Sequence, residues 1–160
     1  MAVEMAEHPK GALRTGSVAD ELARPVGHLE VVVVSPAQPI FEGPAHWVTA
    51  PALDGQLGIW PQHAPLVAAL GSGLLRIGQE GGKVDRFAVR GGFLKVGANR
   101  VTILVDSAVA EAEAGANKVD AEHDLQTTRE ALRSPKSDAE FTELIDRRDW
   151  SEARLKLAEE

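Results

Sequence analysis

The sequence contains no cysteine, so neither a disulfide framework nor thiol chemistry is available to it. It also lacks any run of eighteen apolar residues, and its longest apolar cluster, Val31 to Val34, has only the length of a strand. No apolar segment follows the N-terminus, which argues against a secretory signal. The Gly-x-x-x-x-Gly-Lys-Ser/Thr phosphate loop and the Gly-x-Ser-x-Gly nucleophile motif are both missing. These absences argue against an enzyme with a site of its own.

The charge is acidic and unevenly distributed. The net charge of the 160 residues is −7, which argues against a general binder of nucleic acids or anionic membranes. Residues 1–106 carry nine basic and ten acidic residues, a net of −1, whereas residues 107–160 carry eight and fourteen, a net of −6. Because the pattern of apolar residues changes at the same place, we expect a domain boundary near Ser107.

Short strand-like segments separated by glycine turns fill the part of the chain before this boundary. Leu29 to Val34 is rich in β-branched residues, which is typical of a buried strand. Glu80-Gly81-Gly82 and residues 97–100 each separate two such segments and predict hairpin turns. Many short strands at close spacing indicate an all-β sandwich or barrel.

The stretch 53–66 holds two glycines and two prolines among large apolar residues. Pro61 and Pro65 each fix a backbone angle and remove a backbone donor, so they stiffen the chain between two strands. Such a loop presents Gln62 and His63 outward, either as contact residues or as residues chosen for turn geometry.

Trp60 follows a predicted strand, Gln56 to Ile59, and precedes the loop. Tryptophan has a large area to bury, so we favour a core position under the loop. An exposed Trp60 would instead be an anchor at an interface.

Helical spacing begins beyond residue 107. Apolar residues and one threonine recur at four, three and four positions from Ala121 to Leu132. Asp120 is the expected N-cap of this helix, and Pro135 is expected to end it. Ser137 and Glu140 then have the spacing of a capping box and open a second helix, which Asp149 either restarts or continues. Two such acidic helices are expected to pack as an antiparallel hairpin.

Three segments together resemble one known family. Gly55 to Leu66 follow its Gly-(Glu/Gln)-Leu-Gly-Ile-x-Pro-x-His-Ala-Pro-Leu run throughout, and Gly91 to Val96 and Asn99 to Leu104 follow two further segments. The chain resembles the epsilon subunit of the bacterial F-type ATP synthase, which is equivalent to the mitochondrial delta subunit. The resemblance covers about residues 28–108 and implies a ten-stranded β-sandwich followed by a small α-helical hairpin.

The expected organisation therefore has three parts. Residues 1–27 lack hydrophobic periodicity and are predicted to be a mobile N-terminal extension, about which the resemblance says nothing. Residues 28–107 are predicted to form the β-sandwich, and residues 108–160 the helical domain.

The resemblance also implies a function. The implied function is that of a non-catalytic rotor subunit that joins the gamma subunit to the membrane c-ring. Such a subunit has no cofactor or metal and lies at the cytoplasmic face of a bacterial plasma membrane. Alpha and beta subunits are possible partners of the helices, which in many relatives inhibit hydrolysis. The implied gamma contacts are Ser35, Gln62 and His63. The implied c-ring contacts are Asp54 and Gln56. The residues that would make inhibitory tail contacts, or else be solvated charges balanced by nearby acids, are Arg129, Arg133, Arg147 and Arg148.

Two other functions were weighed from the residues. A free-standing β-sandwich that binds a small ligand would need a cavity. A metal-dependent hydrolase would need His28, His46 and His63 to converge, with Asp54 as a fourth ligand, but the spacings of eighteen and seventeen match no metal signature. Neither alternative explains the amino-acid sequence of the segment 53–66.

Overall fold

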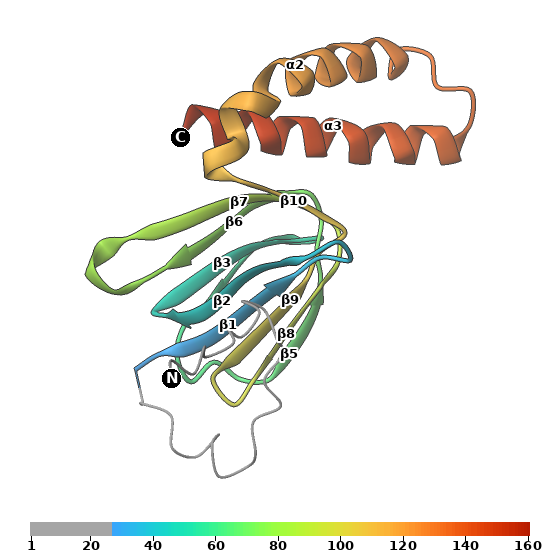
Figure 1. Cartoon of the computed structure of the whole chain (residues 1–160). Coiled ribbons are helices and arrows are strands. Elements are labelled where there is room, and N and C mark those ends of the chain that lie inside the picture. Colours follow the sequence, from blue (N-terminus) through green and yellow to red (C-terminus); the bar gives the residue numbers. More distant parts are fainter. Residues whose placement is uncertain (1–26) are drawn as a thin grey trace, which may run out of the picture.

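A two-layer β-sandwich is followed by a pair of helices that lie on one side of it (Figure 1). The computed structural model describes residues 27–160, so the predicted mobile extension lies outside the described residues except for Gly27. Residues 27–160 form ten strands, two short 3-10 turns and two α-helices, which confirms the predicted fold class. The strands are β1 (Leu29–Val34), β2 (Pro39–Ala45), β3 (Trp47–Ala52), β4 (Gly55–Ile59), β5 (Leu66–Ala69), β6 (Gly73–Gly78), β7 (Val84–Arg90), β8 (Phe93–Gly97), β9 (Arg100–Leu104) and β10 (Ser107–Ala110). The helical elements are η1 (Glu80–Gly82), η2 (Glu111–Glu113), α2 (Ala114–Ala131) and α3 (Asp138–Glu159).

Each layer is a five-stranded sheet. The first sheet has the order β2-β1-β9-β8-β5, and the second has the order β10-β7-β6-β3-β4. All neighbouring strands in this part of the chain are antiparallel except β1 and β9, which are parallel. The charge-based boundary between residues 107 and 108 falls inside β10, because that strand continues to pair with β7 as far as Ala110.

The registers sort the turns of the sandwich into two opposite ends. One end, which we call the His63 end, carries the turns at residues 45–47, 60–65 and 97–100. The other, which we call the Asp54 end, carries the turns at residues 35–38 and 53–54.

The core lies between the two sheets and follows the period of two that a strand imposes. In β1, Leu29, Val31 and Val33 are fully buried and point inward. The second sheet contributes buried residues such as Leu75 and Ile77 from β6 to the same cluster. Burial of branched aliphatic side chains from both layers is what holds the sandwich together.

Gly92 shows why glycine is required in the turn between β7 and β8. Its φ is +109°, a conformation that residues with a Cβ rarely adopt. A Cβ at this position would also fall 1.8 Å from the backbone oxygen of Leu104. The turn therefore brings two backbones together so closely that no side chain fits between them.

The helices differ from the sequence prediction at one point. α2 begins at Ala114, so Asp120 is not its N-cap but an exposed residue within it. The reason is tertiary: Ala114 is buried against Leu74 and Ala88 of the second sheet, and this packing supports a first helical turn that has no capping side chain.

The second helix begins as predicted. Ser137 is its N-cap, and its Oγ accepts a hydrogen bond of 3.1 Å from the backbone N–H of Glu140. The Glu140 carboxylate in turn accepts from the backbone N–H of Lys136. Pro135 lies in the connection between the helices, and α3 continues through Asp149 without a break. Figure 1 shows the two helices side by side and antiparallel, as expected for a hairpin.

Candidate functional site: docking surfaces of the sandwich

The loop between β4 and β5 is stiff and lies at the His63 end. The backbone N–H of His63 donates to the Trp60 carbonyl oxygen at 3.1 Å, which closes a tight turn. Gln62 has a φ of +66°, and its N–H donates to the side-chain oxygen of Asn99 in the neighbouring β8–β9 turn. A ring nitrogen of His63 lies 2.7 Å from the carbonyl oxygen of Ala64. Gln62 is exposed and His63 half-buried, so the loop presents a fixed polar surface.

Trp60 is 56% exposed, so the expected core position is wrong. The preceding residue, Ile59, is the one that enters the core, and strand alternation directs the next side chain the other way. The Trp60 ring lies instead over Gly58: a Cβ on Gly58 would fall 2.5 Å from the ring atom Cζ3. The structure thus has the alternative arrangement, an exposed aromatic side chain next to the loop.

The Asp54 end carries the residues that the resemblance assigns to the c-ring. Asp54 and Gln56 are exposed on either side of Gly55, whose φ is +130°. Leu53 beside them is exposed as well. A tight turn therefore presents one carboxylate, one amide and one apolar side chain together.

Ser35 also lies at the Asp54 end, so the structure separates it from Gln62 and His63. Its hydroxyl donates to the carbonyl oxygen of Gln38 at 2.9 Å and accepts from the Gln38 N–H at 3.2 Å. Ser35 thus stabilises the β1–β2 turn. The three residues assigned to gamma do not form one local cluster.

Only part of the histidine cluster that the metal-hydrolase alternative would need comes together. The rings of His28 and His46 lie 4.7 Å apart between centroids and line a cleft of about 440 Å³ with Glu30 and Glu80. His63 does not line this cleft. Within residues 27–160 no group of three or more potential metal ligands is close enough to hold an ion.

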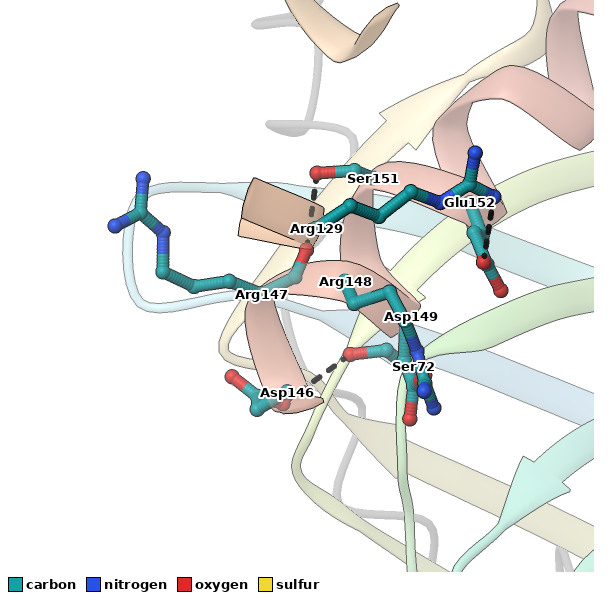
Figure 2. Close-up of polar contacts among 8 residues, drawn as sticks. All are labelled: Ser72, Arg129, Asp146, Arg147, Arg148, Asp149, Ser151 and Glu152. Atoms are coloured by element: carbon teal, nitrogen blue, oxygen red, sulfur yellow. Dashed lines mark hydrogen bonds and ion pairs between the residues drawn. The ribbon is translucent and has the colours of Figure 1, made fainter. Parts of the chain in front are cut away.

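The four arginines of the tail do not form one basic face. Arg129 of α2 reaches Glu152 of α3 at 3.4 Å, and Arg148 binds the adjacent Asp149 at 2.8 Å (Figure 2). The hydrogen bond that the Arg148 guanidinium donates to Asp149 raises the pKa of Arg148, while burial acts in the opposite direction. Arg147 points away from the other side chains drawn in Figure 2. The fourth, Arg133, is exposed just beyond α2.

The sequence analysis missed an apolar surface on the outer face of the first sheet. Phe93, Val67 and Leu104 are 61%, 69% and 50% exposed, and we call them the apolar patch. Phe93 pairs with Leu104 across β8 and β9 and with Ala69 across β8 and β5. Strand alternation in β8 could have predicted this surface. Because Leu94 is buried, the adjacent Phe93 must face outward.

The outer face of the second sheet is covered by the tail. Leu74 of β6 and Ala88 of β7 are buried there against Ala153 and Leu157 of α3. The two outer faces therefore differ: one is closed by the chain's own helix, and the other presents apolar side chains to solvent.

Comparisons with known proteins show the family to which the sandwich belongs. The beta-sandwich domain of the ATP synthase delta/epsilon chain matches residues 28–111, more than half of the chain. The chain belongs to the ATP synthase delta/epsilon family. The resemblance noted in the sequence is thereby confirmed.

Individual members of the delta/epsilon family agree along most of the chain. The ATP synthase epsilon chain of Delftia acidovorans is 38% identical over 113 residues, covering 71% of this chain and 80% of the relative. That of Synechococcus sp. is 44% identical over 101 residues, covering 63% and 72%. That of Desulforamulus reducens is 47% identical over 76 residues, but this match spans only 48% of the chain and 57% of the relative.

Solved structures of the delta/epsilon fold extend the likeness to the helices. A chain in the Euglena gracilis mitochondrial ATP synthase assembly of OSCP, F1 and c-ring aligns with a TM-score of 0.72 at 22% identity, covering 96% of this chain and 91% of that one. A chain of the Tetrahymena thermophila mitochondrial central stalk and c-ring aligns with a TM-score of 0.57 at 20% identity, covering 80% and 94%. At these identities the alignments show the shared fold. Neither helix of residues 27–160 has the length and apolarity that crossing a membrane requires.

Proposed function

We propose that this chain is the central-stalk subunit that joins the gamma subunit of a rotary ATP synthase to its c-ring, without a catalytic site of its own. The observation that carries the proposal is the family match over the whole sandwich, including the stiff loop around His63. It favours this function over the free-standing ligand-binding sandwich. The subunit would be peripheral to the cytoplasmic face of a bacterial membrane, and it would need no lipid anchor because it binds protein.

A coupling subunit needs two separate surfaces, and the sandwich offers them at different places. The exposed turn with Asp54 and Gln56 lies at one end and suits the polar loops of the c-ring. Gln62 and His63 lie at the opposite end and suit gamma. Because the loop at the gamma end is held by backbone hydrogen bonds and two prolines, little conformational entropy is lost when it docks.

The apolar patch supports a single gamma surface that includes the separated Ser35. His63 stands four residues before Val67, so the loop leads directly into the patch along β5. At the far side, Leu104 pairs with Val34, the residue before Ser35. A gamma helix laid across the first sheet would therefore meet polar contacts at both ends and apolar side chains between them, as is usual for an interface.

Co-purification tests the proposal. A tagged copy of the full chain, expressed with the other subunits, is expected to recover gamma, alpha, beta and the c-ring from intact membranes. Consistent recovery of the tagged chain without any of these subunits would reject the proposal.

Substitutions test one residue from each of the two contact sets. His63→Ala and Gln56→Ala are expected to lower proton-driven ATP synthesis by membrane vesicles, because each removes a polar contact at one end of the sandwich. His123→Ala and Gln126→Ala are matched controls, since these residues are exposed on α2. Equal synthesis by all four variants would show that the contact residues are wrong, even if the chain still co-purifies with the complex.

A further inference from the structure

Three arginines project from the outer face of the second sheet beneath α3. Arg76 of β6 and Arg86 of β7 lie directly opposite each other in the register. Like charges at directly opposite positions of a sheet repel each other. The arrangement is therefore unfavourable unless a negative group lies between the two cations, and the residue after α3 provides one. The Glu160 carboxylate binds Arg76 through Oε1 and lies 3.3 Å from Arg86 Nε through Oε2, and Glu111 of η2 lies 3.5 Å from Arg86 Nη1.

The third arginine, Arg90, binds another carboxylate of the tail. Its Nε and Nη2 both donate to Oδ2 of Asp146, at 2.9 and 2.6 Å. The other oxygen, Oδ1, lies 3.4 Å from the hydroxyl of Ser72, a contact drawn in Figure 2. One carboxylate of α3 thus contacts both the β7 strand and the turn before β6.

These ion pairs bracket the part of α3 that packs on the sheet, from Asp146 within the helix to Glu160 just after its last residue. Asp146 and Glu160 are fourteen residues apart, which corresponds to about 21 Å along a helix. Between them the contact with the sheet is apolar. It is made by a buried cluster that includes Leu74 and Ala88 of the sheet and Ala153 and Leu157 of α3, with Val109, Trp150 and Ala158 packed against it. The ion pairs therefore flank this apolar contact and add to the attraction that it provides.

We infer that Asp146 and Glu160, bound to Arg76, Arg86 and Arg90, form an electrostatic latch that holds the helical tail on the sandwich, and that ionic strength sets how often the tail is released. The inference of a latch depends only on ion pairs within this chain. Its link to regulation of the ATP synthase rests on the proposed function.

Salt is expected to open the latch. The pairs are partly exposed, with side chains 26–46% accessible, and screening lengths fall from about 10 Å at 0.1 M salt to about 3 Å at 1 M. Because the chain has no cysteine, two cysteines can be introduced and labelled without background. Lys95→Cys on the first sheet and Ala139→Cys in the first turn of α3, both exposed, report the distance between sandwich and tail by fluorescence energy transfer.

The decisive variant is Asp146→Asn with Glu160→Gln in the labelled full-length chain. At low NaCl it is expected to raise the ratio of released to docked tail about tenfold, the effect of losing the three partly exposed ion pairs of the two carboxylates. It is also expected to flatten the dependence on NaCl that the parent shows. The reversed pair, Arg90→Asp with Asp146→Arg, is expected to restore docking relative to either single change.

Glu143→Gln with Glu159→Gln is the matched control. It removes the same two charges from α3 at exposed positions that contact no sandwich residue through a polar group. If the control releases the tail as much as the latch variant does, net charge rather than specific pairing holds the tail, and the proposal is overturned. Loss of helical circular dichroism in the latch variant alone would also overturn it, because the pairs would then stabilise the helices and not their docking. The isolated chain suffices for all of these measurements, so they remain informative even if co-purification with the other subunits fails.

Discussion

The two outer faces of the sandwich are built alike and used differently. Both present apolar side chains outward, Leu74 and Ala88 on the second sheet and Phe93 and Leu104 on the first. On the second sheet, α3 buries them and adds ion pairs around them. On the first sheet they stay exposed. An outward apolar residue on a strand therefore indicates a covering partner without indicating whether that partner belongs to the same chain.

The largest effect is expected for Leu157→Ala, which tests the closed face. Leu157 is 1% exposed between α3 and the second sheet, and removing such a side chain costs about 2–5 kcal/mol of unfolding free energy. Urea unfolding followed by circular dichroism measures the loss. Val119→Ala, at an exposed position on α2, is the control and is expected to be nearly neutral. Equal losses in both variants would mean that the tail is not packed on the sheet.

Phe93→Ser tests the open face and should separate binding from stability. We expect the affinity for purified gamma to fall about tenfold or more, as at the centre of an interface, while the unfolding free energy changes by no more than about 0.5 kcal/mol. Titration calorimetry and urea unfolding measure the two quantities. Phe141→Ser on α3 is the control, because this phenylalanine is also exposed. Unchanged affinity for Phe93→Ser would remove the apolar patch from the gamma surface.

Deletion of residues 114–160 removes the helices that cover the second sheet, so that both outer faces are open in the assembled enzyme. The cut is placed after η2 so that β10 keeps its pairing with β7. Because a latched tail spends most of its time on the sandwich, we expect ATP hydrolysis at low salt to change by less than about twofold on deletion. A severalfold rise would mean that the tail acts as a brake under these conditions.

The smallest effect is expected for Arg129→Ala. Arg129 pairs with Glu152 between the two helices, both side chains are about half exposed or more, and such pairs contribute at most about 0.5 kcal/mol. Tail docking, measured by the same energy transfer as above, should not change. Arg90→Ala is the comparison, and docking that is weakened equally by both changes would contradict the special role given to the pairs beneath α3.

The sequence predicted well those strands, turns and helix caps that depend on residues close together in the chain. The glycine turns, the β-branched strand at Leu29 to Val34 and the cap at Ser137 act within a few residues, and all appear in the structure as expected. The start of α2 was wrong because Ala114 gains its stability from a distant strand rather than from a local cap. Trp60 was placed wrongly because its size suggested burial, whereas the register of β4 directs it outward.

The features of the site also divide into those that depend on neighbouring residues and those that depend on long-range strand pairing. The stiffness of the 60–65 loop follows from Pro61 and Pro65, which act locally. The separation of Ser35 from His63 depends on strand order and so on long-range pairing.

The amino-acid sequence by itself determined the family, the strands and turns, and the presence of two acidic helices, because each depends on neighbours in the chain. Tertiary structure alone decided which face of the sandwich the helices cover and which stays open. It did so by bringing Arg76, Arg86 and Arg90 beneath two carboxylates far along the chain, an attraction that exists only once the sheet has formed.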